Sequence, residues 1–132
     1  MKNEKKYRDA FESGLKNYLD KKSPKNLYEP IQYILNLGGK RIRPLLVLMS
    51  ADLFGKKYKE AVSAALAIEI FHNFTLVHDD IMDSAKLRRG SATVHSKWNI
   101  NTGIISGDVM LISAYQILEE YENPLFSKLT KL

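Results

Sequence analysis

Residues 71–90, FHNFTLVHDDIMDSAKLRRG, are the stretch from which the rest of the chain can be interpreted. An apolar segment leads directly into three aspartates, Asp79, Asp80 and Asp83, that fall within five residues. Positions three and four apart share one face of a helix, so His72 lies on the same stripe as Asp79 and Asp83. The stretch therefore predicts a helix that ends in a group of carboxylates.

These carboxylates are placed where a helix tolerates them poorly. Like charges four residues apart destabilise a helix by about 0.2–0.5 kcal/mol, and the carboxyl end of a helix favours cations over anions. Both penalties indicate a cation between the side chains, and ligation by oxygen alone fits Mg²⁺ better than zinc. We predict that Asp79, Asp80 and Asp83 hold Mg²⁺. The alternative is an ordinary solvated helix end.

Two groups of cations flank this acidic helix in the sequence. Arg88 and Arg89 follow it closely and can grip phosphate oxygens as two-pronged donors. Upstream, residues 38–44 read GGKRIRP, in which two glycines allow an anion to approach the start of a helix. Lys40 and Arg43 are three apart and share a face, whereas the intervening arginine points elsewhere. Taken alone, the upstream motif would fit a glycine helix end with surface cations.

Three motifs of this chain resemble, in their order along the sequence, motifs of the trans-prenyltransferases, which form the polyprenyl synthetase family. HDDIMD with LRRG resembles the first aspartate-rich motif of the family, and GGKRIRP resembles its isopentenyl diphosphate motif. SGDVML, at residues 106–111, is similar to the segment that follows on the next long helix. The resemblance covers roughly residues 5–132 and implies the N-terminal part of an all-α, isoprenoid-synthase-type fold.

The resemblance also implies an activity and a set of site residues. The activity is the Mg²⁺-dependent, head-to-tail condensation of isopentenyl diphosphate with an allylic diphosphate. Asp79, Asp80 and Asp83 would be the catalytic metal ligands. By the family pattern, isopentenyl diphosphate is held by Lys40, Arg43, His72 and Arg89, and the allylic diphosphate is held by Arg88.

The sequence also supports predictions about the roles of four other residues. The bulky Phe74, five residues before Asp79, favours a short product of the C15 or C20 class. His78 lies off the stripe and is expected to be structural. Asp108 interrupts an apolar helix face, so we expect it to be buried beside a hydrogen-bond donor or a cation. Ala92 stands where the family often has proline, which loosens the following loop.

The 132 residues carry one aspartate-rich motif, whereas the family has a second on a later helix. We therefore expect a single, truncated polyprenyl synthetase domain, 1–132, that is inactive alone and self-associates, as a homodimer, through exposed apolar faces. A non-catalytic or regulatory subunit of a prenyl synthase and a diphosphate hydrolase that uses the same acids remain alternatives.

Composition also bears on whether the chain is a nucleic-acid-binding, secreted or membrane protein. The formal charge of +5 would suit nucleic acid, but no aromatic-interleaved basic stripe or zinc spacing supports that partner. There are no cysteines, no signal peptide and no uncharged apolar run long enough to span a membrane, so we expect a soluble, cytoplasmic protein. Helical periodicity predicts an all-α bundle, with helices near 3–22, 24–37, 41–54, 59–83 and 101–121, a short helix after 123, and a loop with one helical turn at 84–98.

Overall fold

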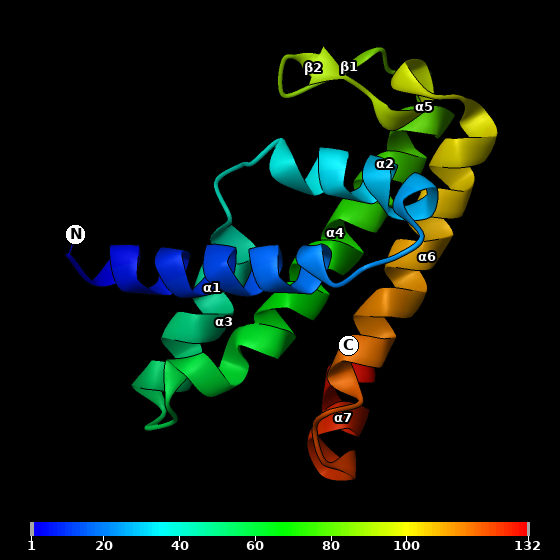
Figure 1. The fold of residues 1–132 in the computed structure, drawn as a ribbon. Coiled ribbons are helices and arrows are strands. Elements are labelled where there is room, and N and C mark those ends of the chain that lie inside the picture. Colours follow the sequence, from blue (N-terminus) through cyan, green and yellow to red (C-terminus); the bar gives the residue numbers. More distant parts are fainter. Residues whose placement is uncertain (1, 132) are drawn as a thin grey trace.

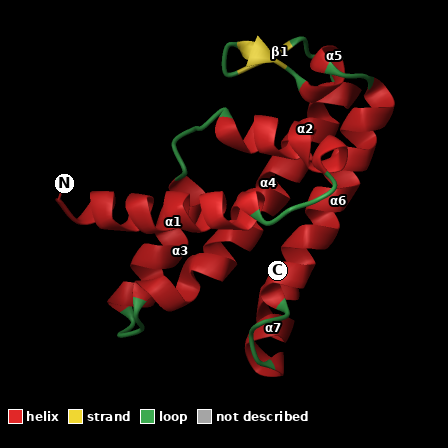
Figure 2. Ribbon diagram, in the orientation of Figure 1, coloured by secondary structure: helices red, strands yellow, loops and turns green. Residues whose placement is uncertain are grey.

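The computed structural model describes residues 2–131, and most of them are helical (Figures 1 and 2). The helical bundle confirms the predicted fold class. In chain order the elements are α1 (Lys2–Asp20), α2 (Lys25–Asn36), α3 (Ile42–Leu53), η1 (Tyr58–Ala61), α4 (Val62–Met82), β1 (Leu87–Arg88), β2 (Ser91–Ala92), α5 (Val94–Lys97), α6 (Ile100–Leu118) and α7 (Asn123–Thr130).

Helix α4 forms the centre of the molecule, and α6 lies along one side of it (Figure 1). Glycines allow them to approach closely near the acidic end of α4. A Cβ atom at Gly107 would overlap the ring of His78, and one at Gly103 would come within 2.9 Å of Ile81 Cδ1. His78 also bonds to the Ile104 carbonyl at 3.1 Å, so its predicted structural role agrees with its position between the two helices.

Helices α1 and α2 cross α4 and bury large apolar side chains against it (Figure 1). On α1 these side chains recur at the predicted three- and four-residue steps and include Phe11, Leu15 and Leu19. At the start of α2, the sequence Ser23-Pro24 predicts Ser23 as the N-cap and Pro24 as the first helical residue, and the structure differs. Pro24 itself is the N-cap, with no side-chain capping bond, because the helix begins one residue after it.

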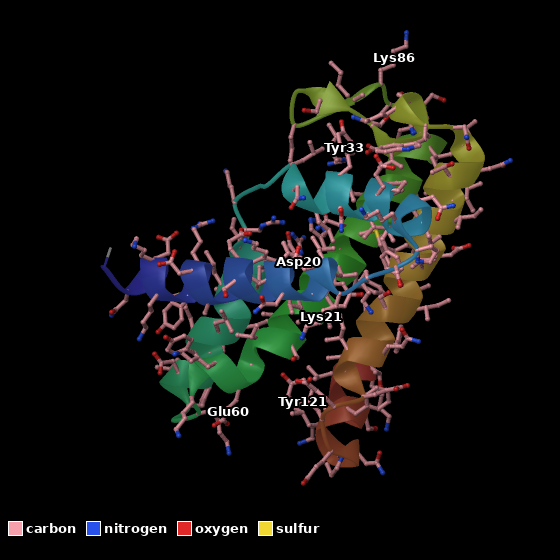
Figure 3. The ribbon with its side chains drawn as sticks, viewed as in Figure 1. Asp20, Lys21, Tyr33, Glu60, Lys86 and Tyr121 are labelled. Carbon is pink, nitrogen blue, oxygen red and sulfur yellow. The ribbon has the colours of Figure 1, made fainter. Side chains whose placement is uncertain are left out.

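The short segment between α4 and α6 folds into a hairpin, β1–β2, followed by the one-turn helix α5, where a loop with one helical turn was expected. The hydroxyl of Tyr33 on α2 donates to the Ala92 carbonyl at 2.8 Å, which fastens the hairpin to the bundle (Figure 3). The hairpin is therefore held over the acidic end of α4 (Figure 1).

The outer faces of α3 and α6 contradict the sequence expectation. The run LLVLMSADLF, at residues 45–54, is apolar almost all round and predicts a helix buried on every side, but Leu46 and Leu53 on α3 are 56% and 79% exposed. On α6 the buried face consists mainly of small residues, because close packing on α4 leaves little room, and Ile105 and Ile112 face outward. Asp108 also lies on the outside, with a 60% exposed side chain 3.9 Å from His78, so the expected burial of this acid was wrong.

Among residues 2–131, one helical segment, Tyr58–Met82, is long and apolar enough to cross a membrane by length and composition. Of the most apolar 18 consecutive residues in this segment, 44% are buried inside the bundle. Its central place between α1, α3 and α6 accounts for that apolar character.

Candidate active site

Helix α4 presents two of the three predicted metal ligands on one exposed face. Asp79 and Asp83 are both exposed and lie four residues apart. Asp83 is the C-cap of the helix, and its backbone N–H donates to the Asp79 carbonyl at 2.8 Å. The expected pairing of these two carboxylates on one helix face therefore agrees with the structure.

Asp80 lies on a different face and has a partner of its own. It is 3% exposed, and both of its carboxylate oxygens accept from Arg88 on the hairpin. The two bonds are Arg88 Nε to Oδ2 at 2.7 Å and Nη2 to Oδ1 at 2.8 Å. The bond to Asp80 raises the pKa of the Arg88 guanidinium. Two predicted site residues thus neutralise each other, and Asp80 is turned away from Asp79 and Asp83.

Across the described part of the chain, no three His, Cys, Asp or Glu side chains lie close enough together to hold a metal. The predicted set of three aspartates is therefore not assembled, and its metal role stays a prediction. The donor chemistry still fits Mg²⁺, which is commonly bound through one or two carboxylates with water and substrate phosphate as the other ligands. Asp79 and Asp83 are the residues that would hold it.

The glycine motif forms a loop that receives Arg89. Gly38 and Gly39 have positive φ values of 75° and 135°, and Gly38 follows α2 in the left-handed conformation that glycine favours after a helix. The Arg89 guanidinium donates to the Gly38 carbonyl and lies against Gly39, where an added Cβ would come within 2.9 Å of Arg89 Cζ. The second glycine thus provides the space that the arginine occupies.

Arg43 and His72 meet between α3 and α4. Arg43 Nη1 lies 3.2 Å from His72 Nε2, and because a guanidinium can only donate, the ring nitrogen accepts. Burial, and then the charge of Arg43, lower the pKa of His72. Lys40 is exposed nearby, and its carbonyl accepts from Arg8 at 3.2 Å. Arg43 and His72 are thus together, and Arg89 lies against the same glycine loop.

A cavity of about 390 Å³ opens beside Arg43 and His72. Its walls are otherwise largely apolar and come from α4, α6 and α7, with Phe71, Thr75, Tyr115 and Leu118 among them.

Phe74, expected from the sequence to limit product length, does not line this cavity. Its ring packs edge-on against Phe71 at 5.4 Å and His78 at 5.0 Å. The sequence interpretation missed Phe71, although its spacing of four residues from Thr75 and eight from Asp79 places all three on one side of the helix.

Comparisons with known proteins identify the family of this chain. Residues 24–132 match the polyprenyl synthetase family. The chain is 44% identical over 110 residues to a geranylgeranyl pyrophosphate synthase from Geoglobus acetivorans, covering 83% of this chain and 34% of that protein. It is 38% identical over 119 residues to a farnesyl diphosphate synthase from Geobacillus stearothermophilus, covering 88% of this chain and 40% of that protein.

The fold comparison extends the match to nearly the whole chain. A crystal structure of a geranylgeranyl pyrophosphate synthase superposes with a TM-score of 0.92 at 55% identity, over 97% of this chain and 39% of that one. The chain thus spans about a third of the length of the geranylgeranyl pyrophosphate synthase relative and two-fifths of the farnesyl diphosphate synthase relative. With the ordered motifs, the all-helical bundle and both comparisons in agreement, the chain belongs to the polyprenyl synthetase family.

Proposed function

We propose that this chain forms the metal- and diphosphate-binding part of an isoprenyl diphosphate synthase. The activity would be the head-to-tail condensation of isopentenyl diphosphate with an allylic diphosphate. The observation that carries the proposal is the contact between Arg43 and His72, both of which line the largely apolar cavity. An anion-binding pair beside an apolar cavity suits a substrate with a charged head and a hydrocarbon tail.

Each charged residue has a proposed task. Arg43, His72, Lys40 and Arg89 would hold isopentenyl diphosphate, because Arg43 meets His72 and Arg89 lies against the glycine loop that precedes Lys40. Arg88 would hold the allylic diphosphate at the hairpin. Asp79 and Asp83 would hold Mg²⁺, with Asp80 as a third ligand if Arg88 releases it.

The proposed chemistry needs stabilisation of the departing diphosphate. Bound Mg²⁺ supplies that stabilisation by neutralising charge on the phosphate oxygens. Arg88 adds a fixed cation at the same end of α4, and its ion pair with Asp80 fixes where the guanidinium lies before substrate arrives. The hydrocarbon tail would lie in the cavity that Phe71 and Tyr115 line, and the product would be of the C15 or C20 class.

The described residues offer carboxylates on one side of the proposed diphosphate site. Beyond Asp83 the acids are Asp108, Glu119, Glu120 and Glu122, all exposed on or just after α6. Carboxylates on a second side would be needed to hold enough Mg²⁺ to neutralise a departing diphosphate. We propose that residues 1–132 alone bind Mg²⁺ and diphosphate and turn over negligibly. The exposed apolar faces of α3 and α6 also support self-association as a homodimer.

Calorimetric titration of the 132-residue chain with inorganic pyrophosphate, with and without Mg²⁺, tests this proposal. We expect binding that depends on Mg²⁺ and that falls about tenfold or more in Asp79→Asn, because a ligand carboxylate is lost. Asp108→Asn, an exposed carboxylate on α6, is the matched control and should bind like the unmodified chain.

Three results would contradict the proposal. The first is pyrophosphate binding that ignores Mg²⁺ and Asp79. The second is prenyl transfer by the isolated chain at the rate of a full-length synthase, which would refute the need for further residues. The third is release of inorganic phosphate without prenyl products, which would instead select a diphosphate hydrolase.

A further inference from the structure

Arg41 is a charged side chain enclosed by the bundle, with 4% of its surface exposed. It precedes α3 and its guanidinium reaches three other helices. Nε donates to Glu12 on α1 at 3.0 Å, Nη1 to Glu69 on α4 at 3.1 Å, and Nη2 to the Leu35 carbonyl on α2 at 2.7 Å. The guanidinium also lies 5.5 Å from the centre of the Phe11 ring. One side chain thus joins four helices.

The backbone position of Arg41 makes these contacts relevant to the proposed diphosphate site. Lys40 precedes it, Arg43 follows two residues later, and the Arg89 guanidinium lies against Gly39. Arg41 adopts a left-handed conformation with φ of 54°, which is unfavourable for a residue with a Cβ atom. The side-chain contacts hold the loop in this conformation against that cost.

Glu69, the buried partner of Arg41, also acts on the cations of the site. It is 3% exposed and lies one turn before His72 on α4. Burial, followed by the charge of Arg41, lowers the pKa of Arg89, and the Glu69 carboxylate opposes this change. Glu69 likewise opposes the lowering of the His72 pKa by burial and by Arg43. The carboxylate therefore offsets repulsion among cations that are gathered before an anion arrives.

We propose that Arg41, held by Glu69, is a positioning residue for diphosphate binding. It does not contact the anion. It fixes residues 38–43 against α4 at the distance at which Arg43 meets His72, so that the cations are arranged before the ligand binds. This inference rests on the proposed function, since it assigns a supporting residue to the same site.

The test compares the affinity for inorganic pyrophosphate, in the presence of Mg²⁺, among variants of the 132-residue chain. Arg41→Gln removes the charge and two of the three anchored nitrogens, and it should weaken binding about tenfold, as the loss of a residue that orients a ligand group typically does. Arg41→Lys keeps the charge but cannot reach three helices from one nitrogen. It should therefore bind pyrophosphate more tightly than Arg41→Gln and about threefold more weakly than the unmodified chain. Both are measured at a temperature at which circular dichroism shows native helix content.

Tyr7→Phe is the control for a purely structural effect. It removes the hydrogen bond from Tyr7 to Asp52, 2.6 Å long, which joins α1 to the far end of α3. This variant should lower the midpoint of thermal unfolding and leave the pyrophosphate affinity unchanged, whereas the Arg41 variants lower both.

The outcomes separate the inference from the proposed function. Folded Arg41→Gln that binds pyrophosphate like the unmodified chain would overturn the inference alone, as would complete recovery in Arg41→Lys. If Arg41→Gln does not fold, the affinity of Arg41→Lys decides by itself. An unmodified chain that binds no pyrophosphate would overturn the proposed function together with the inference.

Discussion

Two arginine–carboxylate pairs anchor the two ends of the candidate site, and they differ in what surrounds them. Arg41 and Glu69 meet at 3.1 Å with both side chains at least 96% buried, in the middle of α4. Arg88 and Asp80 meet at 2.7 Å near the end of α4, where the arginine is 24% exposed. Water can take the place of a carboxylate at the second pair and not at the first. The comparison indicates that the Arg41–Glu69 pair stabilises the fold and that the Arg88–Asp80 pair can exchange partners.

Removing the buried carboxylate charge should have the largest effect on stability. Glu69→Gln keeps the size of the side chain but leaves Arg41 with one charged partner, Glu12, whose side chain is 45% exposed. Breaking a buried ion pair from one side destabilises a protein by about 3–5 kcal/mol, and the remaining partner places the expected loss near 3 kcal/mol. Urea unfolding followed by circular dichroism measures it. A loss below about 1 kcal/mol would show that Glu12 alone compensates Arg41.

The same change at the pair between α4 and the hairpin should cost less. In Asp80→Asn the amide oxygen can still accept from Arg88, whose guanidinium can also turn to water, so we expect a loss of about 1–2 kcal/mol. Measured by the same unfolding experiment, the difference between the Glu69 and Asp80 variants is the quantity that sharpens the comparison. Equal losses of unfolding free energy would mean that the pair at the hairpin stabilises the fold as much as the pair in the core.

Much of the fold follows from local patterns in the sequence. The three- and four-residue spacing of apolar residues such as Phe11, Leu15 and Leu19 agrees with the helix predicted near residues 3–22, and Gly38 and Gly55, both with positive φ, follow the ends of α2 and α3. These features could be predicted because each depends on a few neighbouring residues. The outward faces of α3 and α6 could not, because which apolar residues are buried depends on how closely two helices approach.

The site was partly predictable for the same reason. Asp79 and Asp83 share a helix face by spacing alone, whereas the partner of Asp80 is set by a hairpin. That hairpin turns at Arg89 and Gly90, with φ values of 52° and 77°, and an arginine in this conformation leaves no signal in the sequence. A buried Arg41 was equally hidden, since its acceptors come from three separate helices.

The smallest expected effect is a pH dependence that originates between the two pairs, at His72. Burial first, and then the charges of Arg43 on α3 and of Arg89 and Arg88 on the hairpin, lower its pKa from 6.5, and Glu69 on its own helix opposes them. As pH falls through 6.5, the unfolded chain therefore takes up the proton before the folded chain does. The contribution of His72 to stability is complete above about pH 6.5 and is lost below it.

His72→Gln should remove this part of the pH dependence, because glutamine does not titrate. Unfolding free energies of both proteins, measured by urea between neutral and mildly acidic pH, should show a shallower decline for the variant. Inorganic pyrophosphate sharpens the test, since an anion beside Arg43 and His72 favours the protonated ring and should restore stability to the unmodified chain at acidic pH. An equal decline of the unfolding free energy with pH in the two proteins would contradict the prediction. It would mean that His72 has the same pKa in the folded and the unfolded chain, and that burial and the nearby arginines do not shift it.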